Sequence, residues 1–150
     1  MRMWTTIGVA LLVPALWAGE ARSHCQVPCG IYDDSARVAQ LKEHTATLRK
    51  AVQHIAQLAA KGDPQSRNQL VRWVTTKEAH AEKIIRTVSD YFLVQKIKPA
   101  TQGSGRKAYL DKLVRHHAVM VAAMKCKQTA SAANVAALTK AIDRIAPYWR

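Results

Sequence analysis

Apolar residues recur every three or four positions through most of the chain after residue 33, and this spacing predicts amphipathic helices. The first helix begins where Asp34 or Ser35 can cap it, and it ends at Gly62, just before the turn signal Asp63-Pro64. Three further helices are predicted over residues 65–94, 106–127 and 131–146. The stretch from Lys96 to Gly105 is rich in Gly, Ser and Pro and predicts a loop.

Each predicted helix carries an apolar stripe that faces its neighbours. The stripes comprise Val38, Leu41, Thr45, Leu48, Val52, Ile55 and Ala59; Leu70, Val74, Ala81, Ile84, Val88 and Tyr91; Leu110, Leu113, His117, Met120 and Met124; and Val135, Leu138, Ile142, Ile145 and Trp149. We interpret His117 as a core histidine. Lys77 interrupts the second stripe, and we expect this cation to mark where the N-terminal segment docks. No strand-like alternation follows residue 23, so the pattern predicts an all-α fold, an antiparallel four-helix bundle.

Residues 1–23 have the layout of a secretory signal peptide: a short positive start, an apolar run from Trp4 to Ala18 and a polar tail with small residues. The apolar run is shorter than the roughly 20 residues that span a bilayer. A cut after Ser23 would leave His24 as the first residue, whereas a cut after Ala21 also satisfies the small-residue rule. We expect an exported protein, periplasmic or secreted, with no stable membrane association after cleavage.

The remaining residues 24–150 are enough for one domain with one core. The chain has a formal charge of +13, and loss of the signal peptide removes two arginines and one glutamate, which leaves +12. A basic surface favours anionic partners, but an exported chain seldom meets nucleic acid, so a small anion or a membrane face is preferred. Three cysteines in an oxidising compartment leave one unpaired.

Two of the cysteines lie in the segment His24–Tyr32, which reads HCQVPCGIY and precedes the first helix as a non-helical hook. Pro28 and Gly30 suit a tight reversal that brings Cys25 and Cys29 to one side. One interpretation is a disulfide between these cysteines. A second is a zinc site, which would need a fourth ligand such as His44, His54 or His80.

A third interpretation uses the free end that cleavage creates. The α-amine of His24 and the amide nitrogen of Cys25 are nitrogen donors, and the thiolates of Cys25 and Cys29 are sulfur donors. Two nitrogens and two sulfurs in a plane, with the His24 imidazole above, favour nickel(II) or copper(II). Such electron-rich donors lower the potential of the trivalent state, which suits one-electron chemistry on a small oxygen species.

The hook resembles that of the nickel-containing superoxide dismutases. The pattern His-Cys-x-x-Pro-Cys-Gly-x-Tyr matches at His24, Cys25, Pro28, Cys29, Gly30 and Tyr32. Asp33 and Arg37 are similar to the start of the family's first helix, and Lys77-Glu78 and Asp90-Tyr91-Phe92 to stretches of its second. The resemblance covers most of residues 24–95. It implies a four-helix bundle that assembles into a homohexamer.

The resemblance also implies the roles of the site residues. His24, Cys25 and Cys29 would hold one nickel ion per chain, cycling between Ni²⁺ and Ni³⁺, and Tyr32 and Tyr91 would order water or an anion near the approach of the substrate. The reaction implied is the conversion of superoxide to dioxygen and hydrogen peroxide. The rival hypothesis is a non-catalytic exported protein whose hook is oxidised or binds nickel, copper or zinc.

The chain departs from the family pattern around the axial imidazole. Gln26 stands where well-known members carry Asp, and the carboxylate that helps to hold the imidazole falls near Ala39-Gln40. Glu43 or Glu78 is the expected substitute, because a ligand histidine usually needs an acceptor for its second ring nitrogen. His80 stands near the position of an expected arginine partner. Cys126 is expected to be a buried thiol or a partner for another chain.

Overall fold

The computed structural model describes residues 33–150, which form helices and no strand. The helices are α1 (Asp34–Ala59), α2 (Pro64–Arg86), α3 (Gly105–Gln128) and α4 (Ala132–Ile145). A π-helical segment, η1 (Thr87–Lys96), continues α2, and a 3₁₀ turn, η2 (Ala146–Trp149), continues α4. The expected signal peptide and the hook with His24, Cys25, Cys29 and Tyr32 lie outside the described residues.

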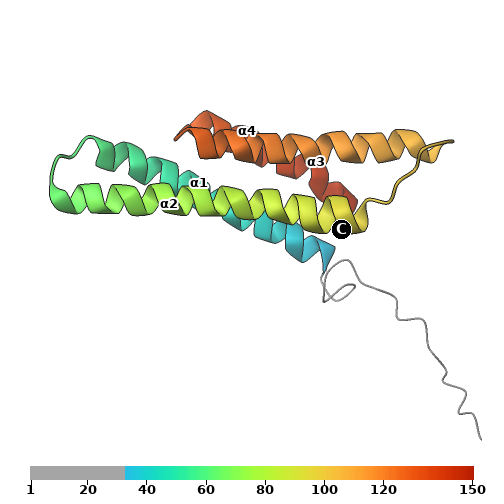
Figure 1. Ribbon diagram of the computed structural model, residues 1–150, viewed down its shortest axis with the longest axis horizontal. Coiled ribbons are helices and arrows are strands. Elements are labelled where there is room, and N and C mark those ends of the chain that lie inside the picture. Colours follow the sequence, from blue (N-terminus) through green and yellow to red (C-terminus); the bar gives the residue numbers. More distant parts are fainter. Residues whose placement is uncertain (1–32) are drawn as a thin grey trace, which may run out of the picture.

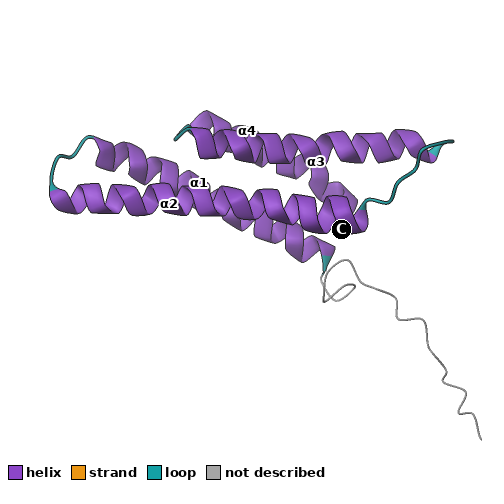
Figure 2. Cartoon of the chain, in the orientation of Figure 1, coloured by secondary structure: helices purple, strands orange, loops and turns teal. Residues whose placement is uncertain are grey.

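The helices close into a ring in which α1 packs against α2 and α4, and α3 packs against the same two neighbours. Consecutive helices are joined by short connections and run antiparallel, as the ribbon shows (Figures 1 and 2). The predicted all-α fold, an antiparallel four-helix bundle, is therefore confirmed for this part of the chain. None of the described helices is both long and apolar enough to cross a membrane.

Short polar side chains fix where three of the helices begin. Asp33 caps α1 by accepting a hydrogen bond of 2.7 Å from the Ser35 amide, and Asp63 accepts one of 2.8 Å from the Ser66 amide at the start of α2. Ser131 has the same role at α4. The cap of α1 is thus one residue earlier than predicted, and the carboxylate of Asp34 has another use.

The core contains the predicted stripes of the first and last helices. On α1 every predicted position except Ala59 is buried, and on α4 and η2 all five are. At the end of the bundle, Phe92 of η1 packs its ring 4.8 Å from that of Trp149, and both are buried. These contacts attach the C-terminal turn to the end of the second helix.

The predicted stripe of the third helix is only partly correct: Leu113 and Met120 pack against the core, but the centre of the buried face lies one position earlier. The fully buried residues of α3 are His116, Val119, Ala123 and Cys126. Leu110 and Met124, predicted to be core, are 44% and 43% exposed, and His117 is exposed. The error has a physical cause: α3 carries apolar side chains on both of its sides, so periodicity alone does not say which side is inside.

The buried histidine is therefore His116, and it links α3 to the C-terminus. The indole N–H of Trp149 donates to Nε2 of His116 over 3.0 Å, so the proton of the neutral ring is on Nδ1, which donates over 2.7 Å to the Lys112 carbonyl. Both ring nitrogens are satisfied. Burial lowers the pKa of His116 from its ordinary value, although the bond to the Lys112 carbonyl opposes this shift.

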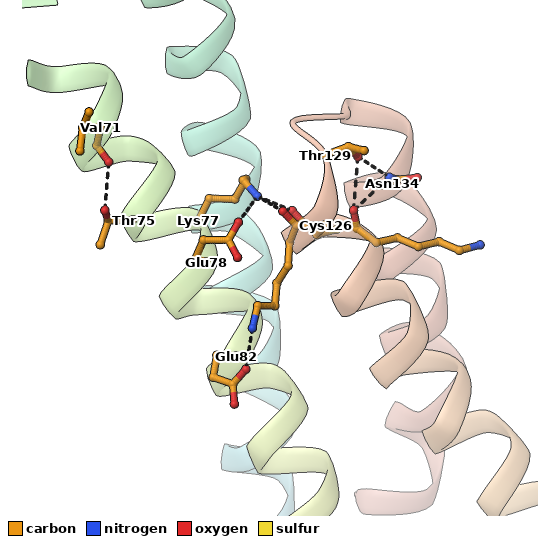
Figure 3. A network of polar contacts seen from close by, with 10 residues as sticks. Val71, Thr75, Lys77, Glu78, Glu82, Cys126, Thr129 and Asn134 are labelled. Atoms are coloured by element: carbon orange, nitrogen blue, oxygen red, sulfur yellow. Dashed lines mark hydrogen bonds and ion pairs between the residues drawn. The ribbon is translucent and has the colours of Figure 1, made fainter. Parts of the chain in front are cut away.

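Lys77 is buried because its ammonium group caps the end of another helix. Nζ donates to the carbonyl oxygens of Cys126 and Lys127, over 2.8 and 2.5 Å, and to Oε1 of Glu78 over 2.5 Å (Figure 3). The last carbonyls of α3 lack helical partners and carry partial negative charge, so a cation is favoured there. This contact accounts for the interruption of the apolar stripe; the hook, which was expected to dock at Lys77, lies outside the described residues.

Candidate functional site: the end of the bundle that follows the hook

The hook joins the bundle at the first turn of α1, because Asp34 follows Tyr32 by two residues. The same end of the bundle contains η1, and the C-terminus lies near it (Figure 1). Tyr91 of η1 is brought to this place from a point far along the sequence: its hydroxyl donates a hydrogen bond of 2.5 Å to Oδ1 of Asp34. Of the five predicted site residues, only Tyr91 lies within the part of the chain that the structure describes; the others are His24, Cys25, Cys29 and Tyr32.

Asp34 and Lys96 complete a small polar cluster around Tyr91. Nζ of Lys96 lies 2.9 Å from Oδ1 of Asp34 and 5.6 Å from the centroid of the Tyr91 ring. Tyr91 is 8% exposed, whereas the side chains of Asp34 and Lys96 are 30% and 32% exposed. Burial, followed by the bond to Asp34, raises the pKa of Tyr91 to about 12, so its hydroxyl stays protonated at neutral pH.

The π-helical geometry of η1 holds Tyr91 in place. The Ile97 amide donates over 2.9 Å to the carbonyl of Phe92, five residues earlier, and the Gln95 side chain donates over 2.8 Å to the Asp90 carbonyl. Tyr91 and Phe92, adjacent in this segment, are both buried, and their rings meet edge to face at 5.1 Å. Turns of π-helical geometry are frequent at functional sites.

The two glutamates expected to support the axial imidazole have different surroundings. Glu78 is bonded to Lys77, and it precedes Tyr91 by thirteen residues, roughly 20 Å along the helix axis. Glu43 is exposed on α1. Gln40, near the position where the family pattern has a carboxylate, accepts a hydrogen bond of 3.1 Å from Arg37. Asp34 is a carboxylate at the hook end of α1 that the sequence analysis treated only as a helix cap.

His80 lies beside His44 across the α1–α2 contact, with ring centroids 4.9 Å apart and the rings perpendicular. Nδ1 of His80 is buried and has no hydrogen-bond partner among residues 33–150. Burial is the main cause that lowers the pKa of both rings. The pKa of His44 is lowered further by His80 and Lys83, and that of His80 by Lys83. The pair is a feature of helix packing, well removed from Tyr91 along α2.

Within residues 33–150, no three His, Cys, Asp or Glu side chains are grouped so that they could hold a metal ion. Cys126 is a free thiol, 1% exposed, as one of the two interpretations predicted, and burial raises its pKa. A buried, protonated thiol is a poor metal ligand. The donors that fit a nickel ion are those of the hook: two thiols and the amine, amide and imidazole nitrogens of residues 24, 25 and 29.

Two residues of this site, Asp34 and Lys96, were not predicted. The signal was present in the connection at Gly62 and Asp63: an antiparallel pair joined there brings together residues whose numbers sum to about 125. His44 with His80 and His54 with Trp73 follow that rule, and so do Asp34 and Tyr91. Pairing the two helices in this way would have found Asp34.

The family model for nickel-containing superoxide dismutases matches residues 19–150, a range that includes the whole hook. No curated protein and no solved structure shows significant similarity to the chain. The match extends over the hook, the bundle and the last third of the chain, where the motif comparison gave no alignment. The chain therefore belongs to the family of nickel-containing superoxide dismutases, oxidoreductases that act on superoxide with a nickel cofactor.

Proposed function

We propose that this chain dismutates superoxide with a nickel ion held by its hook. The residues that would hold the ion are His24, through its α-amine and imidazole, Cys25, through its amide nitrogen and thiolate, and Cys29, through its thiolate. The observation that carries the proposal is the family match, which spans these residues, together with a donor set that suits nickel. When bound, the ion would supply one-electron redox chemistry, by which two superoxide anions and two protons give dioxygen and hydrogen peroxide.

The rest of the chain orients the hook and shapes its surroundings. Tyr32 lies in the hook and Tyr91 at the end of the bundle to which the hook is attached, and we place both beside the approach of superoxide. Pro28 would fix the turn between the two cysteines. The strong positive charge of the chain supports attraction of a small anion, an effect that salt should weaken.

The proposal requires that a protease expose the amine of His24. The layout of residues 1–23 supports a signal peptide and an exported protein, periplasmic or secreted. Cleavage after Ser23 makes the nitrogen donor, so export and assembly of the site would be one event. Residues 24–150 then form the mature domain.

We also propose that the mature protein is a homo-oligomer, a hexamer by family resemblance. An exposed apolar stripe on α3 supports assembly. Its apolar members, spaced by four, seven and three residues, are Leu110, Val114, Val121 and Met124, with exposures of 44, 67, 40 and 43%. At 100° per residue they lie within an arc of about 80° on the helix surface, and such a contiguous apolar surface favours contact with another protein surface.

Metal analysis of matched cysteine variants tests the proposed function. Purified mature protein should contain about one nickel per chain and show a trivalent-nickel resonance that dithionite removes. Cys25→Ser and Cys29→Ser should lose both nickel and activity, whereas Cys126→Ser should keep both, since Cys126 is a buried thiol of α3. Stoichiometric zinc, or a permanent Cys25–Cys29 disulfide, would favour the non-catalytic rival instead.

A further inference from the structure

The cluster at the end of the bundle fixes the direction of one hydrogen bond. Asp34 accepts from Tyr91 over 2.5 Å and is paired with Lys96 at 2.9 Å. A carboxylate paired with an ammonium group carries no proton and can only accept. The proton of this hydrogen bond is therefore that of the Tyr91 hydroxyl.

A phenol has one proton to donate, and the lone pairs of its oxygen remain available as acceptors. With its proton directed at Asp34, the Tyr91 hydroxyl can meet any other group at its oxygen only as an acceptor. An anion such as superoxide would need a donor. Tyr91 in this state suits a water molecule or an N–H or O–H group of the hook.

Capping of α1 does not explain the position of Asp34. Asp33 already caps the helix through the Ser35 amide, and the side chain of Asp34 turns to η1, where it meets Tyr91 and Lys96. The bond joins two segments 57 residues apart, at the end of the bundle that the hook follows. Two side chains of η1 thus converge on one carboxylate of α1.

We propose that Asp34, held by Lys96, is a positioning residue that makes Tyr91 a hydrogen-bond acceptor toward the hook. Tyr91 then orders a donor, a water molecule or a hook N–H or O–H group, beside the metal, and it does not donate to superoxide. This inference rests on the proposed function, since it places the hook at this end of the bundle. It decides between the two partners, water or anion, that the family resemblance left open for Tyr91.

The test is a double-mutant cycle in the mature, nickel-loaded protein. Asp34→Ala releases the Tyr91 proton, and we expect kcat/KM to fall about tenfold, the effect of one hydrogen bond to a charged group. Asp34→Asn keeps a carbonyl that can accept from Tyr91, so it should retain most of the rate. In the Tyr91→Phe background, Asp34→Ala should have no further effect. Equal losses in both backgrounds, equal losses in Asn and Ala variants, or no loss at all would overturn the inference.

A second readout needs no activity. Titration of the phenols by ultraviolet absorbance should show one tyrosine with a pKa of about 12, absent in Tyr91→Phe and moved toward its ordinary value in Asp34→Ala. Asp111→Asn is the matched control, because Asp111 likewise accepts from Tyr148 and pairs with a cation, Arg115. It should lower the pKa of Tyr148 and leave kcat/KM unchanged. An unmoved Tyr91 titration in Asp34→Ala would contradict the inference.

Nickel content of the same preparations separates the two proposals. If wild-type protein lacks nickel, the proposed function fails, whatever Asp34 does. If every variant holds one nickel per chain and the cycle shows no coupling between Asp34 and Tyr91, only the positioning role fails.

Discussion

The hydroxyl of Tyr91 donates to the carboxylate of Asp34 across a 57-residue separation, and this bond ties the π-helical end of the second helix to the start of the first. The hook is attached at that start, so its point of attachment is held to the bundle by a named contact. Lys96 adds an ion pair to the same carboxylate. The start of α1, from which the hook extends, is thereby held against η1.

Stability at alkaline pH should report on Tyr91. Its pKa in the folded protein is about 12, against an ordinary value of about 10, so the folded state binds this proton more tightly than the unfolded state. The free energy of unfolding should therefore decrease as the pH rises from 10 to 12. Below pH 10 the stabilising contribution of Tyr91 is complete. Tyr91→Phe should make this decrease shallower in urea denaturation. An identical slope in the variant would show that Tyr91 does not contribute.

Acid should destabilise the folded state through the buried imidazole of His116. Burial lowers its pKa, so below the ordinary value of about 6.5 the unfolded state binds a proton that the folded state does not. Stability is then complete above pH 6.5 and is lost as pH falls. His116→Gln should cost about 2 kcal/mol at pH 7 and flatten the pH dependence. His117→Gln, on the exposed side of the same helix, should change neither; if the two variants behave alike, the neutral buried ring is not the cause.

Lys77→Met tests the helix-capping role of the buried ammonium group. The variant leaves two carbonyls of α3 without their partner, and we expect the free energy of unfolding to fall by about 2–3 kcal/mol. Lys83→Met, at an exposed position of α2, should have little effect. Nickel uptake and activity should be unchanged in folded Lys77→Met protein. Loss of nickel without loss of stability would support the hypothesis that Lys77 docks the hook.

The apolar stripe of α3 predicts how assembly can be broken. Val114→Glu places a charge on the most exposed member of the stripe, 67% exposed, and light scattering should show smaller assemblies with unchanged helix content. Gln57→Glu introduces the same side chain at an exposed position of α1 and should leave the assembly intact. If Val114→Glu assembles as wild type does, the stripe is not an interface between copies.

Helix periodicity predicted the bundle because α1 and α4 are apolar on one side only, so Leu41 or Leu138 has one possible environment. It failed on α3, where His116 and His117 are adjacent and the helix is apolar on both sides. The prediction of Tyr91 came from the family resemblance. Its partner Asp34 follows from pairing the first two helices about the turn at Gly62 and Asp63. The place of Lys96 depends in addition on a π-helical segment, which no local sequence pattern encodes.

The central claim is that His24 becomes the first residue and that its amine helps to bind nickel. Intact-mass measurement of native, active protein, made with nickel retained, tests it directly. The account predicts a chain of residues 24–150 with one nickel ion. A chain that still carries Ser23 or any earlier residue, in material that dismutates superoxide at the full rate, would contradict it.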